Sequence, residues 1–202
     1  MFHLIGVAHR VQSKPKGSDD SEEQKAYRDC LSEAVRRISP VVVGEEFSEH
    51  ALREAGKAAR TGHVSLTKTV ADSLGISHRF CDPEPQARRE MGYVEGGQLF
   101  PRLLIEANLD NEEAESRAFS IEITKYWPLR EKYWLEQLVD VADREVIFVC
   151  GDAHLESFGA LLAEIGIESA VFARRIGLNQ GDDAFWSRIM AYLAAHPELR
   201  AK

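Results

Sequence analysis

The sequence predicts an α/β fold with a mainly parallel sheet flanked by helices. Short apolar runs of strand length recur along the chain, for example at residues 41–43 and 146–150. Continuous apolar runs of this kind are typical of strands buried on both faces. Amphipathic helical segments separate the runs, and this alternation favours parallel pairing. A polar group follows most of the runs directly, at the edge where open α/β sheets carry their chemistry.

The N-terminal elements are a strand, a loop and a helix. The strand begins at residue 2 and leads to His9, and residues 10–17 form a basic loop with Pro and Gly as breakers. A helix with one apolar face follows and ends before Pro40. Its start is open between three residues that favour the N-cap. These candidates are Asp19, Asp20 and Ser21.

Two further strand-and-helix units follow. The second strand covers residues 41–47 and contains Glu45 and Glu46, and Ser48 is suited to cap a helix over residues 49–60. The third unit consists of a helix and a strand. It comprises a helix over residues 67–74, a stop at Gly75 and a strand over residues 76–81 followed by Asp82.

Residues 83–143 contain no convincing strand and are predicted to form a helical insertion before the last long strand. This insertion is a cap over the site, a surface for homodimer formation or a plain buried helical layer. After the long strand and its helix, residues 168–172 form a short strand. Asp183 then caps an amphipathic helix that is expected to pack on the sheet. The whole chain, residues 1–202, is expected to be one domain.

Composition excludes several classes of protein. The net charge is −8, which argues against nucleic acid or an anionic membrane as the main partner. No segment approaches the roughly 20 apolar residues that a membrane span needs. Because Met1 leads straight into a predicted strand, no leader is expected. The three cysteines show no CxxC spacing. Reduced thiols and a cytoplasmic location are therefore expected.

Four predicted strands end in side chains that are suited to catalysis or metal binding. These are His9, then Glu45 with Glu46, then Asp82, and finally Asp152 with His154. Because parallel strands share one carboxyl edge, we expect these groups to converge. His9 and His154 each stand three residues after a glycine. A third match to this GxxH spacing ends at His78 but precedes its strand, so His78 is expected outside the site.

Two imidazoles with two or three carboxylates suit Mn²⁺, Zn²⁺, Co²⁺ or Fe²⁺. The expected ligands are His9, Glu46, Asp82, Asp152 and His154. A bound ion would lower the pKa of its water towards about 7, and Glu45 or Glu46 would then act as general base. Two plainer interpretations remain open. Asp152 is also suited to cap the following helix, and each histidine taken alone is suited to a hydrogen-bonded place in the core.

Other chemistries are not supported. The sequence contains no GxSxG elbow, no P-loop and no GxGxxG fingerprint. Cys150 lies inside an apolar run, where burial and inertness are expected of a thiol.

The two GxxH elements, the second as Gly151-Asp-Ala-His154-Leu before an amphipathic helix, resemble the TraB/Tiki proteins. They also resemble the wider superfamily with the erythromycin-esterase-like and ChaN-like proteins. The resemblance extends to Glu45 or Glu46, to Asp82 with Arg88 or Arg89, and to a helix bearing Arg130.

The resemblance implies metal-dependent hydrolysis of a small-molecule or peptide substrate, with Arg88, Arg89 or Arg130 polarising the scissile carbonyl or holding a substrate carboxylate. It also allows a metal-free esterase with a histidine as general base. The ChaN-like branch implies a third function that is not enzymatic. There His9 or His154 would be an axial ligand of haem.

Overall fold

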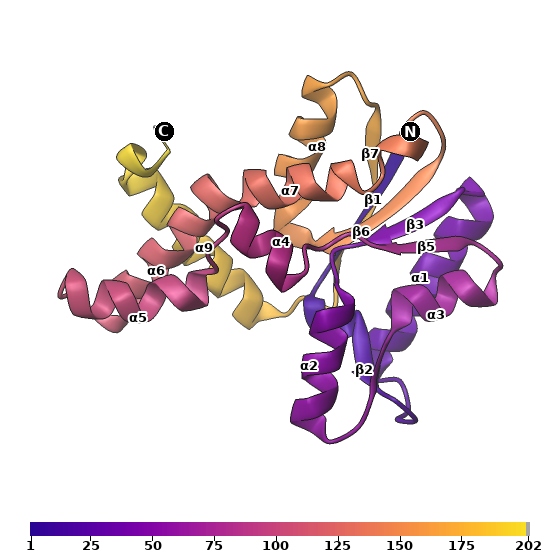
Figure 1. The fold of residues 1–202 in the computed structure, drawn as a ribbon, viewed down its shortest axis with the longest axis horizontal. Helices are drawn as coiled ribbons and strands as arrows, with labels where there is room; N and C mark the ends of the chain where they lie inside the picture. Colours follow the sequence, from indigo (N-terminus) through magenta and orange to yellow (C-terminus); the bar gives the residue numbers. More distant parts are fainter. Residues whose placement is uncertain (201–202) are drawn as a thin grey trace. The chain divides into compact units, whose positions relative to one another are not determined.

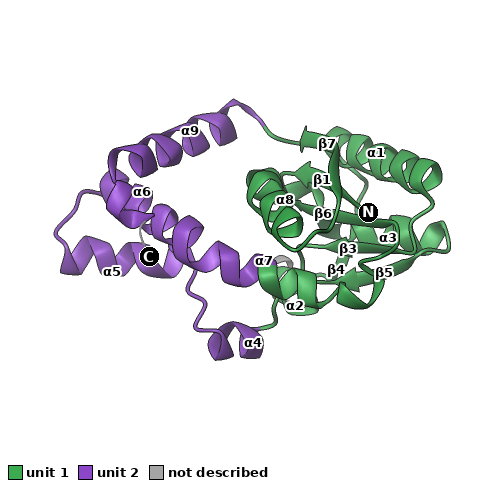
Figure 2. Cartoon of the chain, turned by 90° about the horizontal axis from the view of Figure 1, so that it is seen from above, with its two compact units in different colours: residues 1–84, 132–178 green, residues 85–131, 179–202 purple. Residues whose placement is uncertain are grey.

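The computed structural model describes residues 1–200, which divide into two compact units (Figure 2). The first unit comprises residues 1–84 and 132–178. The second comprises residues 85–131 and the C-terminal segment that begins at residue 179. Most of the predicted helical insertion therefore lies in the second unit, together with the C-terminal segment.

The first unit is built on five parallel strands in the order β5-β3-β6-β1-β7 (Figure 1). The strands span Phe2–Val7 (β1), Val42–Glu45 (β3), Ser77–Phe80 (β5), Val146–Gly151 (β6) and Ser169–Ile176 (β7). This topology confirms the predicted α/β fold with a mainly parallel sheet. The strand β6 lies in the middle, between β3 and β1, so the carboxyl ends of these three strands adjoin.

Both faces of the sheet are covered by helices. The side chains of Val146, Phe148 and Cys150 lie in one core cluster, and those of Ile147 and Val149 lie in the other. Because successive side chains of β6 enter different cores, residues 146–150 are apolar throughout. The helices α1 (Glu22–Ile38) and α3 (Leu66–Ser73) contribute to the second cluster, and α8 (Leu155–Glu164) with the C-terminal part of α7 (Trp127–Glu136) contributes to the first.

In the N-terminal half of the chain, the helices α1 and α2 (Glu49–Ala59) begin directly after residues that the sequence suggests as N-caps. Ser21 caps α1, and its side chain accepts a hydrogen bond from the backbone of Gln24 in a complete capping box. Ser48 caps α2, as the sequence predicts. Of the three candidates for the first cap, the structure therefore selects the one that has a glutamine three residues later.

Part of the predicted basic loop is a strand. Residues Ser13–Pro15 (β2) pair antiparallel with His63–Ser65 (β4) to form a separate two-stranded ribbon. Each strand has only three residues, too few for a hydrophobic period to be recognised. The ribbon places Ser65 and the start of α3 beside the chain that follows His9.

The last strand is also longer than predicted. It continues through Arg174 and Arg175 to Ile176, although the sequence suggests an end near residue 172. This strand lies at an edge of the sheet and several of its residues are exposed. An edge strand accepts charged side chains, so the loss of apolar character after Phe172 does not mark its end.

The second unit is helical, and its described residues contain no strand, as the sequence predicts for the insertion. Its elements are α4 (Pro85–Glu90), α5 (Gly96–Glu106), α6 (Asn111–Ile121), a π-helical turn (Glu122–Tyr126), the start of α7, and α9 (Gln180–Ala195). None of the helices that the structure describes is long and apolar enough to cross a membrane.

Two expectations for the C-terminal helix are wrong. The helix α9 packs against α6 within the second unit, where the sequence suggests packing on the sheet. The rings of Phe185 and Trp186 meet Phe119 at centroid distances of 5.0 and 6.4 Å. Asn179 rather than Asp183 is the cap, because its side chain accepts hydrogen bonds from the backbone N–H groups of Gly181 and Asp182 in the first turn of the helix.

Candidate functional site

Three polar side chains meet at the carboxyl ends of the three central strands. His9 begins the 3₁₀ turn His9–Val11 after β1, and His154 ends the turn Asp152–His154 after β6. Glu46 directly follows β3, and its backbone N–H donates to the carbonyl of Val149 at 2.8 Å. Because β3, β6 and β1 are neighbours, one edge of the sheet presents all three groups.

The carboxylate of Glu46 lies between the two imidazoles. Its Oε1 is 3.6 Å from Nε2 of His9 and 3.5 Å from Nε2 of His154. Its Oε2 accepts a hydrogen bond of 2.6 Å from the backbone N–H of Gly151. The side chains of Glu46 and His154 are buried, whereas that of His9 is 53% exposed. Solvent therefore reaches this cluster at His9.

The two GxxH elements interlock at their glycines. A Cβ atom on Gly151 would lie 3.0 Å from Nε2 of His9, and a Cβ atom on Gly6 would lie 2.5 Å from Cδ1 of Leu155 and closer still to Asp152. The glycine of each element thus leaves the space that side chains of the other element occupy. This close approach, rather than an unusual backbone angle, explains why glycine stands at these positions.

The substitution Gly6→Ala is expected to lower the free energy of unfolding by about 1–3 kcal/mol, because the side chains of Asp152 and Leu155 would have to shift to make room for the added methyl group. The matched control is Gly159→Ala in α8, where the nearest neighbours of an added Cβ are an ordinary 3.8 and 3.9 Å away. The control is expected to be neutral or slightly stabilising, since alanine favours a helix. Urea unfolding of both variants measures this difference. Equal stability of the two variants would contradict the interlocked arrangement.

Glu45 belongs to a different cluster from Glu46. Its Oε1 accepts a hydrogen bond from the Ser65 hydroxyl at 2.6 Å and lies 2.8 Å from Nε2 of His78. Burial and, next, the charge of Glu45 raise the pKa of Tyr27 well above its ordinary value. The structure thus pairs His78 with Glu45, while Glu46 is the acid that faces His9 and His154.

Asp82 is connected to His154 through Trp134. The indole Nε1 of Trp134 donates to Asp82 at 3.1 Å, and the indole ring packs edge-on against the imidazole of His154 at a centroid distance of 4.9 Å. A carboxylate that holds an indole in place supports the packing of the histidine. The structure thus shows Asp82 in a supporting contact, whereas the sequence predicts it as a metal ligand.

Asp152 bonds to the last strand. Its Oδ1 accepts a hydrogen bond of 2.5 Å from the backbone N–H of Arg175, and its Oδ2 lies 3.3 Å from the guanidinium of Arg174. No side-chain cap bond is made at the start of α8, so the capping role that the sequence left open for Asp152 is not found. The role the structure shows for this carboxylate is to join β7 to the turn that carries His154.

The three arginines of the sequence prediction lie in the second unit. Arg88 and Arg130 place their guanidinium carbons 5.3 and 6.0 Å from the ring centroid of Tyr93, and Arg88 also pairs with Glu95. Arg89 is exposed. Tyr93 in turn donates to the buried carboxylate of Glu122 at 2.7 Å. Arg88 and Arg130 thus come together around one tyrosine.

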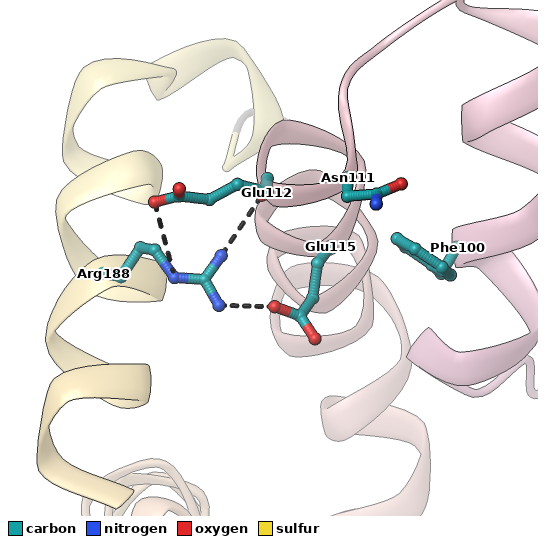
Figure 3. Close-up of a pocket in the computed structure, with 5 residues that line it drawn as sticks. All are labelled: Phe100, Asn111, Glu112, Glu115 and Arg188. Carbon is teal, nitrogen blue, oxygen red and sulfur yellow. Dashed lines mark hydrogen bonds and ion pairs between the residues drawn. The ribbon is translucent and has the colours of Figure 1, made fainter. Parts of the chain in front are cut away.

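The second unit also contains an open pocket of about 450 Å³ beside α9 (Figure 3). Arg188 reaches into it and contacts the side chains of Glu112 and Glu115 and the backbone carbonyl of Glu112. These contacts use the guanidinium to fasten α9 to α6. Sequence reasoning does not single out this arginine, because a charged residue on an amphipathic helix is usually solvated.

The donor set at Glu46 fits a metal ion in type, although the described residues contain no group of three or more His, Cys, Asp or Glu side chains already arranged to hold one. Two imidazole nitrogens and a carboxylate oxygen are typical ligands of catalytic zinc. Ligands about 2.1 Å from a tetrahedral ion lie roughly 3.4 Å apart. The separations of 3.5 and 3.6 Å at Glu46 are close to this value.

A cysteine nucleophile is not supported by the structure. Burial raises the pKa of the Cys81 thiol to about 12, and Cys150 is fully buried in the core. Cys30 is only partly buried. An aromatic disulfide reagent is therefore expected to label one thiol per native chain, and the substitution Cys30→Ser should remove that label. Rapid labelling of native Cys150 would contradict the burial of this strand.

No family model, curated protein or solved structure matches the chain. The resemblance to the TraB/Tiki proteins therefore stays a prediction from the two GxxH elements. The class that the structure itself defines is an α/β protein with a polar cluster at the carboxyl edge of its parallel sheet.

Proposed function

We propose that the chain is a hydrolase and that His9, Glu46 and His154 form its reaction centre. The observation that carries this proposal is the spacing around Glu46. Two other histidine–glutamate pairs of the chain lie at hydrogen-bond distance, at 2.8 Å for His78 with Glu45 and 2.6 Å for His3 with Glu145. Both imidazoles at Glu46 stand 3.5–3.6 Å away. This wider spacing suits a group held between the three side chains.

The proposed substrate is an ester or amide bond of a small molecule or peptide. Because Gly151 holds Oε2 of Glu46, Oε1 is the oxygen that faces the histidines. Without an ion it is placed to accept a proton from an attacking water, and with an ion bound it would be one of the ligands instead. A positioned general base typically accelerates such a reaction about 10²- to 10⁴-fold. The exposed face of His9 is the side from which a substrate would enter.

A divalent ion is the activator that this donor set suits best, with His9, Glu46 and His154 as its ligands. When bound, such an ion lowers the pKa of its water to about 7. The protein's contribution is to hold the donors in place: the turn after β1 carries His9, and the contact with Trp134 orients His154.

A metal-free esterase is the second candidate. It is favoured by the pairing of His9 with a buried carboxylate, because Nε2 of its ring lies 3.6 Å from Oε1 of Glu46. In this mechanism His9 would take the proton of water, and Glu46 would stabilise the imidazolium that results. His9 is suited to this role because its ring is half-exposed.

One experiment separates these candidates. Protein purified without chelator or histidine tag is analysed for metals and assayed on p-nitrophenyl acetate and on short peptide p-nitroanilides, with EDTA and then with Mn²⁺, Co²⁺, Zn²⁺ or Fe²⁺. Turnover that EDTA abolishes and an ion restores supports the metal-dependent hydrolase, and turnover that resists EDTA supports the esterase. If the wild type showed no turnover above that of His154→Ala but did show a visible haem spectrum, both hydrolase candidates would be wrong and the chain would be a haem-binding protein.

A further inference from the structure

We propose that Gln12 is a positioning residue that fixes which ring nitrogen of His9 carries the proton. The inference deepens the proposed function and rests on it for its catalytic meaning. The Oε1 atom of Gln12 lies 2.8 Å from Nδ1 of His9. Gln12 is fully buried, which is unusual for a glutamine, and it lies three residues after the histidine.

The backbone around Gln12 is held from two sides. Its N–H donates to the carbonyl of His9 at 3.1 Å, which closes the turn, and its carbonyl accepts from the N–H of Leu66 at 2.8 Å. Because both backbone groups are held, the side chain of Gln12 has little freedom to move away from His9. Its Nε2 makes no hydrogen bond within the described part of the chain, so the bond to His9 is the polar contact that the structure gives this amide.

The chemistry of the amide decides the tautomer. An amide oxygen only accepts, so Nδ1 of His9 must donate to it, and the neutral imidazole then carries its lone pair on Nε2. That nitrogen faces Oε1 of Glu46. If Nε2 carried the proton instead, a charge-assisted bond to the carboxylate of about 2.7–2.9 Å would be expected. The observed 3.6 Å fits two acceptors that face each other.

Two facing acceptors prepare the centre for its reactant. They can share the two protons of one water molecule, or they can hold a cation between them. In metal sites, the ring nitrogen of a ligand histidine that does not bind the metal is commonly held by a hydrogen bond of this kind. The bond fixes the orientation of the ring and its tautomer. Gln12 would therefore determine that Nε2 of His9 is an acceptor in this cluster, without touching the substrate itself.

The test uses the full chain labelled with ¹⁵N. Long-range ¹H–¹⁵N correlation spectra of His9 are recorded at a pH at which its imidazole ring is neutral. The wild type is expected to show the Nδ1–H tautomer. Gln12→Glu should keep it, because a carboxylate also accepts, whereas Gln12→Met should shift the tautomer ratio roughly tenfold towards Nε2–H. Gln98→Met, at an exposed glutamine of α5, is the control and should change nothing.

An Nε2–H tautomer in the wild type would overturn the proposal, and this result needs no variant to fold. An unchanged tautomer ratio in folded Gln12→Met would overturn it too. The readout does not depend on turnover, so the tautomer can be established even if the hydrolase proposal fails. Where turnover is found, kcat/KM should fall in Gln12→Met and recover in Gln12→Glu.

Discussion

Replacing Glu46 by glutamine is expected to reduce kcat/KM for hydrolysis by at least about 100-fold, which is the loss typical of a removed general base. Glutamine has nearly the same shape and retains an oxygen that can accept the N–H of Gly151, so the fold should persist. What is lost is the negative charge between His9 and His154. Steady-state kinetics on the best ester or amide probe measure the effect.

The neighbouring acid supplies the matched control. Glu45→Gln changes the same functional group one position earlier, but its partners are Ser65 and His78. We expect this variant to lose about 1–3 kcal/mol of stability, since a buried polar network is weakened. Its kcat/KM should stay near the wild-type value below the unfolding transition. If Glu45→Gln were as inactive as Glu46→Gln while still folded, the two clusters would have to act as one, and the proposed centre would be wrong.

The approximate place of the cluster could be predicted because it follows from topology. Parallel strands deliver the residues that follow them to one edge, and the sequence shows His9 and His154 directly after apolar runs. Which of Glu45 and Glu46 faces the histidines could not be predicted. Consecutive residues point to opposite sides of a strand, and a shift of one residue in the strand end exchanges their roles.

Other parts of the site have no signal in the sequence. Gln12 stands in a segment that is rich in basic and polar residues, and its burial depends on the ribbon that β2 forms with a strand far along the chain. The contact of Asp152 with Arg175 likewise depends on how far β7 extends. Such contacts are set by tertiary packing, which overrides local pattern.

The second unit shows a similar limit. The apolar face of α9 is evident from the spacing of Phe185, Ile189 and Leu193, and two of these side chains are buried as expected. An amphipathic pattern indicates that one face of a helix is buried, but it does not identify the element against which that face packs. Here the partner is α6, and the ion pairs of Arg188 reinforce the choice.

Adding a divalent ion is expected to raise the thermal midpoint of the EDTA-treated protein by roughly 5–10 °C. A ligand that binds only the native state stabilises it by RT ln(1 + [L]/Kd), which is about 2.7 kcal/mol at a hundredfold excess over Kd. The physical source is the buried carboxylate of Glu46, which faces two imidazole nitrogens at separations suited to a shared ion. Melts with Mn²⁺, Co²⁺, Zn²⁺ or Fe²⁺ added back after EDTA measure the shift.

The variants show whether the shift comes from this cluster. His154→Ala should abolish most of the ion-induced gain, and the gain rather than the midpoint is compared because this buried ring also packs against Trp134. His196→Ala should retain the gain, since His196 lies in the second unit and bonds to the backbone of Tyr192. Should no ion move the wild-type midpoint, the metal-dependent mechanism fails. Hydrolysis would then have to proceed with His9 as the base and Glu46 as its counter-ion.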